Sequence, residues 1–252
     1  MAKILSVHSF RGGTGKSNLT ANLAYLAASQ GNRVGVVDTD IQSPGVHVLF
    51  GLDGMVARSL NDYLWGRCPI EQTACDVSAN LDLPEGNRAR LFVIPSSLNA
   101  GDIARVLRDG YDPALLNDGF HALMQRLDLD LLFIDTHPGV NEETLLSIAI
   151  SDALVILLRP DQQDYQGTAV TVELARRLGV PNLLLVVNKV LPIFDKEAIK
   201  KQAETTFEAQ VAGVLPLSEE MVRLASSDIF CRRYPDHPFT LTVRQILTRL
   251  IA

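Results

Sequence analysis

The chain has 252 residues, of which 47% are hydrophobic and 21% are charged, and its formal net charge is −6 at pH 7. This balance is typical of a globular protein with a large core, and it argues against a disordered or fibrous chain. The negative net charge disfavours general attraction to nucleic acid but leaves room for a local basic patch.

Short apolar segments alternate with amphipathic helical patterns along the chain. Strands are predicted at residues 4–9, 34–38, 91–95, 129–135, 153–158, 183–188 and 211–216. Helices are predicted at residues 16–30, 56–65, 102–108, 113–127, 142–150, 164–178, 196–207 and 241–251. Several strands are apolar without alternation, as expected when both faces are covered. The pattern predicts an α/β fold: one three-layer domain over residues 1–252, with a mostly parallel central sheet flanked by helices.

The length of the apolar runs and the number and spacing of the cysteines predict the cellular compartment. The apolar run at residues 4–7 is too short for a secretion signal, and no run approaches the length that spans a bilayer. An odd number of cysteines at irregular spacing (Cys68, Cys75 and Cys231) indicates free thiols in a reducing compartment. Both features predict a cytoplasmic protein.

A glycine-rich turn follows the first predicted strand and opens the first predicted helix. The residues expected to surround a nucleotide's phosphates are Arg11, Gly12, Gly13, Thr14, Gly15, Lys16, Ser17 and Asn18. Glycines let successive backbone N–H groups turn toward an anion, a lysine adds positive charge, and a serine hydroxyl can ligate Mg²⁺. The general P-loop pattern has a glycine where this chain has Phe10. The alternative, a glycine-rich turn without a ligand, is disfavoured by the strand and helix on either side.

This turn resembles the deviant phosphate loop of the MinD/ParA family of P-loop ATPases, Lys-Gly-Gly-x-Gly-Lys-[Ser/Thr], and the resemblance extends over nearly the whole chain. It implies the P-loop NTPase fold, binding of ATP or ADP with Mg²⁺, and slow hydrolysis. Arg11 stands where the family has its signature lysine. Lys16 and Arg11 are thereby implied to stabilise charge on the phosphates.

Two acidic motifs match the same family. Asp40 is the second aspartate of an Asp-Thr-Asp motif, and the resemblance implies that it places the attacking water and belongs to the Mg²⁺ site with Ser17 and Asp135. Asp135 ends an apolar strand and precedes Thr-His-Pro-Gly, as in the family's second switch, so it is implied to hold Mg²⁺ together with Ser17. For Asp40 the alternative is a loop cap. For His137, lining the turn is favoured over carrying a proton.

Two further positions resemble the family's base-binding residues. Asn188 ends a predicted strand, and its side-chain amide can both donate to and accept from the edge of adenine. Pro216 ends the last strand and is implied to pack on the purine. Position 191 is Leu191, which does not complete the Asn-Lys-x-Asp motif of guanine-binding proteins. ATP is therefore favoured, with Asn188 as a simple strand cap left as the alternative.

In the family, the signature lysine reaches across an ATP-bound dimer to the partner's phosphates. A guanidinium keeps the charge and adds planar, bidentate donors, so Arg11 is predicted to act across a homodimer. The alternative is an ion pair with an acidic neighbour in its own subunit. Residues 161–167 are implied to lie against the partner's nucleotide.

MinD-like members end in a membrane-binding helix, and ParA-like members bind DNA nonspecifically. The last helix here has an apolar stripe but only Arg244 and Arg249 as basic residues, so packing on the core is favoured over membrane binding. Clusters that could contact DNA are Arg176-Arg177, Lys196 with Lys200-Lys201, and Arg232-Arg233.

The resemblance implies an ATPase that cycles between a monomer and an ATP-bound homodimer. It also implies that a protein partner stimulates the ATPase and that the cycle positions or partitions a cargo. An ATP-binding adaptor with negligible turnover is the alternative. An iron protein of the nitrogenase type would need paired cysteines after the second switch, and Cys68 and Cys75 lie elsewhere in the chain.

Overall fold

The computed structural model describes residues 2–83 and 88–252 and is built around one sheet with the strand order β3-β4-β2-β5-β1-β6-β7-β8. The strands are β1 (Lys3–His8), β2 (Arg33–Asp38), β3 (Cys75–Asp76), β4 (Arg90–Ile94), β5 (Leu131–Asp135), β6 (Ala153–Leu158), β7 (Asn182–Val190) and β8 (Gln210–Pro216). Strand β3 pairs antiparallel with β4, and the other described pairs are parallel.

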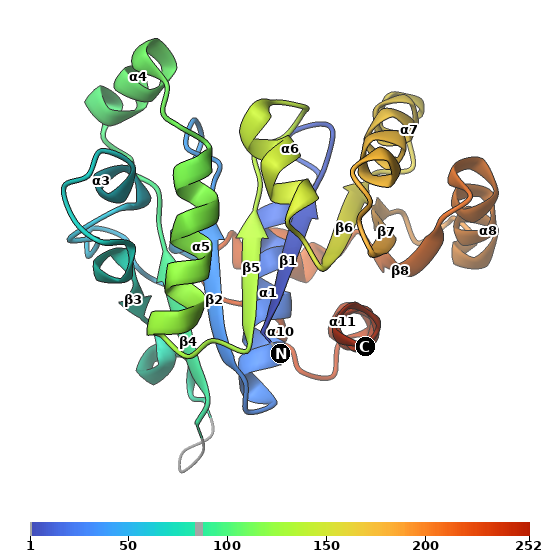
Figure 1. Ribbon diagram of the computed structural model, residues 1–252. Coiled ribbons are helices and arrows are strands. Elements are labelled where there is room, and N and C mark those ends of the chain that lie inside the picture. The colour runs from blue at the N-terminus through green and yellow to red at the C-terminus, as the bar shows by residue number, and fades with distance from the viewer. Residues whose placement is uncertain (1, 84–87) are drawn as a thin grey trace.

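Helices cover both faces of this sheet (Figure 1). They are α1 (Lys16–Ser29), α2 (Val46–Leu49), α3 (Leu60–Leu64), η1 (Ile70–Thr73), η2 (Ser78–Leu81), α4 (Ala100–Asp109), α5 (Ala114–Arg126), α6 (Glu142–Ala149), α7 (Gln162–Arg177), α8 (Lys196–Phe207), α9 (Glu219–Leu224), α10 (Phe230–Arg233) and α11 (Pro238–Ile251). Helices α1, α10 and α11 lie on one face, and α5, α6 and α7 lie on the other.

Each central strand sends alternate side chains to opposite layers. Leu5 and Val7 of β1 belong to the same buried cluster as Leu19 of α1, whereas Ile4 belongs to the cluster that contains Phe120 of α5. A strand buried in this way needs apolar residues at every position, which explains the unbroken apolar runs in the sequence.

The parallel strands bring their carboxyl ends to one edge of the sheet, where ligands of α/β proteins bind. In the register of the sheet, Asp135 at the end of β5 lies opposite both Val7 of β1 and Asp38 of β2. The loops after β1, β2 and β5 therefore start side by side.

The fold class is confirmed, and all seven predicted strands are present as β1, β2 and β4–β8. The predicted helix at 56–65 is shorter, because Ser59 and Asp62 form a capping box that starts α3 at Leu60. Six short elements of the structure were not predicted from the sequence: β3, α2, η1, η2, α9 and α10. Each of these has six residues or fewer, too few to produce a clear periodic pattern.

The last helix packs on the core, as predicted. The apolar stripe of α11 is fully buried and lies against α1 and β8; its members are Val243, Ile246, Leu247 and Leu250. None of the helices in the described ranges is both long and apolar enough to cross a membrane.

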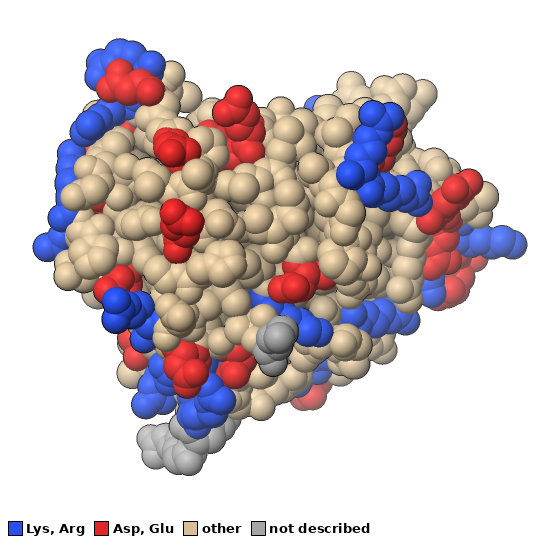
Figure 2. Space-filling view, in the orientation of Figure 1, with Lys and Arg blue, Asp and Glu red and all other residues tan. Residues whose placement is uncertain are grey.

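Basic side chains do not form one continuous patch on the face shown in Figure 2. They gather along the edge beside α3 and α4, along the lower edge of the view, and over α7 and α8, and the surface over α5 and α6 shows uncharged and some acidic side chains. Several of the predicted DNA-contacting arginines also have partners within the chain. Arg176 donates to the carbonyl of Phe207 at the end of α8, Arg177 pairs with Glu173, and Arg232 pairs with Asp82.

Candidate functional site

The turn between β1 and α1 has the backbone geometry of a phosphate loop. Gly13 and Gly15 have φ angles of 75° and 104°, which glycine adopts without the steric cost that other residues have. Gly15 is also the N-cap of α1 and offers no side-chain acceptor, whereas α4, α6, α7 and α8 each have a side-chain cap. Uncapped N–H groups at a helix start are ready donors to an anion. The hydroxyl of Thr14 is buried without a partner in the described chain.

Lys16 is the first residue of α1, and the charges of two aspartates act on it. Its residue surface is only 7% exposed, and the charges of Asp40 and Asp135 act on it from the ends of β2 and β5. Burial raises the pKa of Asp135 to about 6, although the charge of Lys16 and a hydrogen bond from Ser17 oppose this rise. A buried cation among carboxylates is suited to receive the phosphates of a nucleotide.

The donor set fits Mg²⁺ as a metal shared with a nucleotide. Mg²⁺ prefers oxygen ligands and takes only one or two carboxylates beside phosphate oxygens and water. Oδ2 of Asp135 is buried without a hydrogen-bond partner, and the same carboxyl group accepts from Ser17. No three His, Cys, Asp or Glu side chains in residues 2–83 and 88–252 form a metal site by themselves. Ser17 and Asp135 would hold the ion, with phosphate oxygens completing its shell.

Asp38 braces the turn that follows β2. Its Oδ1 accepts from the backbone N–H of Asp40 at 3.0 Å, and its Oδ2 accepts from the N–H groups of Gly45 at 3.0 Å and Val46 at 3.3 Å. Burial, and then the neighbouring charge of Asp135, raise the pKa of Asp38 well above its usual value. Asp38 therefore shapes the loop that presents Asp40, the predicted catalytic residue.

The carboxylate of Asp40 faces a side chain from the second switch. Its Oδ1 accepts from Ser43 Oγ at 2.9 Å and lies 2.7 Å from Nδ1 of His137. Burial would raise the pKa of Asp40, but the hydrogen bond and charge of His137, with the charge of Lys16, outweigh it and lower that pKa. Asp40 is thus ionised at neutral pH and able to accept a hydrogen bond from water.

His8 is the last residue of β1 and is fully buried at the site. The hydroxyl of Thr136 donates to the carbonyl of Val7 at 3.1 Å, so it accepts from Nδ1 of His8 at 2.8 Å, and Nε2 carries no hydrogen. Burial, followed by the charge of Lys16, lowers the pKa of His8 to about 3. His8 is therefore neutral and adds no charge to the site.

A cavity of about 340 Å³ adjoins the phosphate loop on the side of β7 and β8. Its lining residues are Gly13, Gly15, Asn18, Leu19, Asn188, Lys189, Leu215, Pro216, Leu217, Ser218, Met221, Val222 and Phe239. The predicted base-binding residues Asn188 and Pro216 thus lie together with the loop. Mainly apolar walls with a few polar groups suit a purine base.

Comparison with known proteins agrees with this geometry. The family model described as "ParA: NUBPL iron-transfer P-loop NTPase" matches residues 1–251. The chain belongs to the MinD/ParA family of P-loop NTPases. An ATP-binding protein of Methanocaldococcus jannaschii is 29% identical over 252 residues, which cover 100% of this chain and 88% of that relative.

Solved MinD structures share the fold. The cell division ATPase MinD of Pyrococcus furiosus has a TM-score of 0.80 and 18% identity, covering 99% of this chain and 98% of its own. The septum site-determining protein MinD of Pyrococcus horikoshii, solved with Mg-ADP, has a TM-score of 0.78 and 18% identity over 98% of this chain and 95% of its own. The family resemblance and the P-loop fold predicted from the residues are confirmed.

Arg11, at the position of the MinD/ParA signature lysine, contacts its own subunit. It donates to Oε1 of Gln163, and its Nη1 lies 3.9 Å from Oδ1 of Asp164. Asp164 is held more closely by Arg159, at 2.9 Å. The side chain of Arg11 is 41% exposed, and a long, exposed ion pair stabilises little. Contact with an acidic neighbour, the alternative to action across a dimer, is thus present but weak, and the role across a dimer stays a prediction.

Phe10 replaces the first glycine of the general P-loop pattern and packs on α7. A Cβ atom added to Gly167 would come within 2.1 Å of the Phe10 ring. Gly167 thus leaves the space that Phe10 occupies, and the contact ties the start of the phosphate loop to α7.

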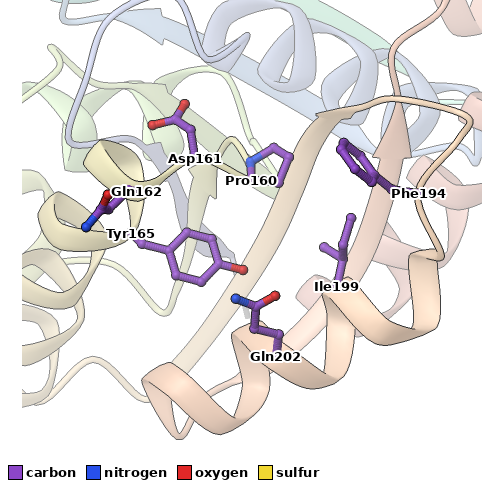
Figure 3. Close-up of a pocket in the computed structure, with 7 residues that line it drawn as sticks. All are labelled: Pro160, Asp161, Gln162, Tyr165, Phe194, Ile199 and Gln202. Atoms are coloured by element: carbon purple, nitrogen blue, oxygen red, sulfur yellow. The ribbon is translucent and has the colours of Figure 1, made fainter.

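Residues in the segment 161–167 face two different parts of the structure. Gln163 and Asp164 face Arg11, whereas Gln162 and Tyr165 line a second cavity of about 390 Å³ between α7 and α8 (Figure 3). The whole lining of that cavity is Pro160, Asp161, Gln162, Tyr165, Phe194, Ile199 and Gln202. The ring of Tyr165 points from α7 toward Gln202 on α8.

Several contacts of the site were not predicted from the sequence. Among them are the hydrogen bonds that Asp38 accepts in the turn after β2, the hydrogen bond of His8, the contact of His137 with Asp40, and the bond from Nζ of Lys189 to the carbonyl of Gly13 at 2.7 Å. A histidine at the end of a mostly apolar strand was a signal for His8. No pattern in the sequence links Lys189 with Gly13.

Proposed function

We propose that this protein binds ATP with Mg²⁺ and hydrolyses it slowly, as a single P-loop ATPase domain over residues 1–252. The observation that carries the proposal is the buried Lys16 at the start of α1, where the backbone amides have no side-chain cap and the charge of Lys16 acts on Asp135, whose Oδ2 has no partner. The cavity at Asn188 beside the same loop supports adenine as the base.

Each residue has a distinct part in this reaction. Mg²⁺, when bound with the nucleotide, neutralises charge on the β and γ phosphates. Lys16 and the loop amides stabilise the charge that develops on the phosphate oxygens. Asp40 orients a water molecule for attack on the γ-phosphorus. A P–O bond forms to that water, the bond to the bridging oxygen breaks, and ADP and inorganic phosphate leave, with one proton of the water released to solvent.

We propose that ATP converts the monomer into a homodimer in which Arg11 contacts the partner's nucleotide. The exposure of Arg11 and its weak pairing with Asp164 support this, because little stability is lost when the side chain turns outward. Sedimentation of the wild type and of Arg11→Ala, each with ATP and with ADP, tests the proposal. Dimerisation of Arg11→Ala with ATP would argue against action across the dimer.

We propose that this cycle positions or partitions a cargo in the cytoplasm and is stimulated by a protein partner. The septum-site and cell-division roles in the names of the MinD neighbours support positioning. DNA is a better proposed track than a membrane, because the apolar stripe of α11 is already buried in the core. Binding to DNA that falls steeply with added salt would support this track.

Phosphate release by the wild type and by Asp40→Ala, with and without DNA, tests the reaction. We expect turnover in the wild type and its loss in Asp40→Ala, while both bind ATP. Equal turnover in the two proteins would remove Asp40 from the mechanism. ATP binding by the wild type without turnover would favour the adaptor instead.

A further inference from the structure

His137 and Asp40 join two loops that are far apart in the sequence. Nδ1 of His137 lies 2.7 Å from Oδ1 of Asp40, and the histidine side chain is 21% exposed. An ionised carboxylate can only accept a hydrogen bond, so Nδ1 carries the hydrogen and donates it. The contact is a charge-assisted hydrogen bond between the loop after β5 and the loop after β2.

The same contact leaves one oxygen of Asp40 available. Oδ1 already accepts from the backbone N–H of Ser43 at 3.2 Å, from its hydroxyl at 2.9 Å, and from His137. No described residue is bonded to Oδ2. The three donors on Oδ1 fix the plane of the carboxylate and reserve Oδ2 for a water molecule.

The loop that carries His137 is itself anchored on both sides. The carbonyl of His137 accepts from the hydroxyl of Thr144 at 3.2 Å, near the start of α6. The N–H of Gly139 donates to the carbonyl of Ser9 at 3.2 Å, next to the phosphate loop. His137 therefore holds Asp40 from a segment whose position is set by α6 and by the loop that would surround the phosphates.

We infer that His137 is a positioning residue, which orients the Asp40 carboxylate so that Oδ2 faces the attacking water. This inference rests on the proposed ATPase function and assigns His137 no proton transfer. Because His137 acts on water placement, its loss lowers kcat and leaves KM for ATP nearly unchanged.

Three substitutions separate this role from general packing. An asparagine amide places its Nδ2 close to the position of histidine Nδ1, whereas a glutamine amide places it nearer Nε2. We expect kcat to fall at least about tenfold in His137→Ala and His137→Gln, with KM within about twofold, and His137→Asn to recover most of the loss. Equal kcat in His137→Ala and wild type, or equal loss in the Asn and Gln variants, would overturn the inference.

A measurement without nucleotide or Mg²⁺ gives an independent readout. In urea unfolding, the midpoint shift caused by His137→Ala should shrink clearly when Asp40 is already alanine, because the bond between them is then absent. Equal midpoint shifts in the two backgrounds would overturn the inference even if kcat falls. A wild type that binds ATP but releases no phosphate would remove the proposed ATPase, and the assigned role of His137 with it, whatever the variants do.

Discussion

The side-chain amide of Asn188 donates to the carbonyl oxygen of Thr14 over 2.8 Å, so the base cavity and the phosphate loop are joined by a direct hydrogen bond. The loop carbonyl can only accept, which assigns Nδ2 to this bond, and no described residue is bonded to Oδ1 of Asn188, which lines the cavity. Lys189 adds a second tie through Gly13. The residues expected to contact the base and those expected to contact the phosphates are therefore joined by hydrogen bonds.

Asn188→Ala should weaken ATP binding and also the preference for ATP over GTP. An open Oδ1 accepts from the amino group of adenine but faces an oxygen in guanine. Loss of this bond and of the loop contact should lower ATP affinity by roughly tenfold or more and GTP affinity by less. Calorimetric titration with both nucleotides measures this. Asn182→Ala, at the opposite end of β7, is the control, and equal losses in the two variants would contradict the assignment.

The contribution of His8 to stability should fall in acid, because His8 is buried without charge. Its pKa is about 3 in the folded protein and 6.5 in the unfolded chain. The unfolded state therefore takes up a proton first, and stability that is complete above pH 6.5 is lost as pH falls toward 3. Between pH 6.5 and pH 5 the contribution lost is about 2 kcal/mol.

Urea unfolding of nucleotide-free protein at a series of pH values checks this dependence. His8→Asn keeps a donor for Thr136 but cannot take up a proton, so its stability should depend less on pH in this range. An identical slope in the wild type and His8→Asn would show that other groups cause the dependence.

Leu250→Ala should destabilise the fold, because α11 is part of the core. Leu250 is fully buried, and such truncations cost about 2–5 kcal/mol. Leu241 lies on the same helix but is 49% exposed, so Leu241→Ala should change the free energy of unfolding by about 0.5 kcal/mol or less. Similar small effects of both substitutions would mean that α11 does not pack as described.

The sheet could be predicted because its strands consist mainly of apolar residues. The run at 153–158, for example, is apolar throughout, as a strand buried on both faces must be. The phosphate loop could be predicted because glycines, lysine and serine act through adjacent positions of the chain. Both signals are local, and a local signal can be read from a sequence without knowledge of the fold.

The contacts that complete the site could not be predicted, because each joins distant segments. Nothing near His137 in the sequence indicates that its ring reaches Asp40, 97 positions earlier. Nothing near Phe10 indicates that it fills the space over Gly167. Such pairs follow from the register of the sheet and the packing of helices on it.

Gly15→Ala should abolish nucleotide binding through geometry alone. The φ angle of 104° strains an alanine, and its Cβ would lie 2.7 Å from Nδ2 of Asn188, so the loop and the base cavity would have to move apart. Gly54 has a φ angle of 69° with open space around it, so Gly54→Ala carries comparable backbone strain away from the loop. ATP binding at the wild-type level by Gly15→Ala would contradict the assigned geometry.

Calorimetric titration of the purified wild type and of Lys16→Ala with Mg-ATP tests the central claim most directly. The arrangement of Lys16, the uncapped amides of α1 and Asp135 predicts saturable binding of one nucleotide per chain by the wild type. Loss of the ammonium group should weaken that binding by roughly 10- to 100-fold. A wild type that binds no nucleotide at millimolar Mg-ATP, or a Lys16→Ala variant that binds equally well, would contradict it.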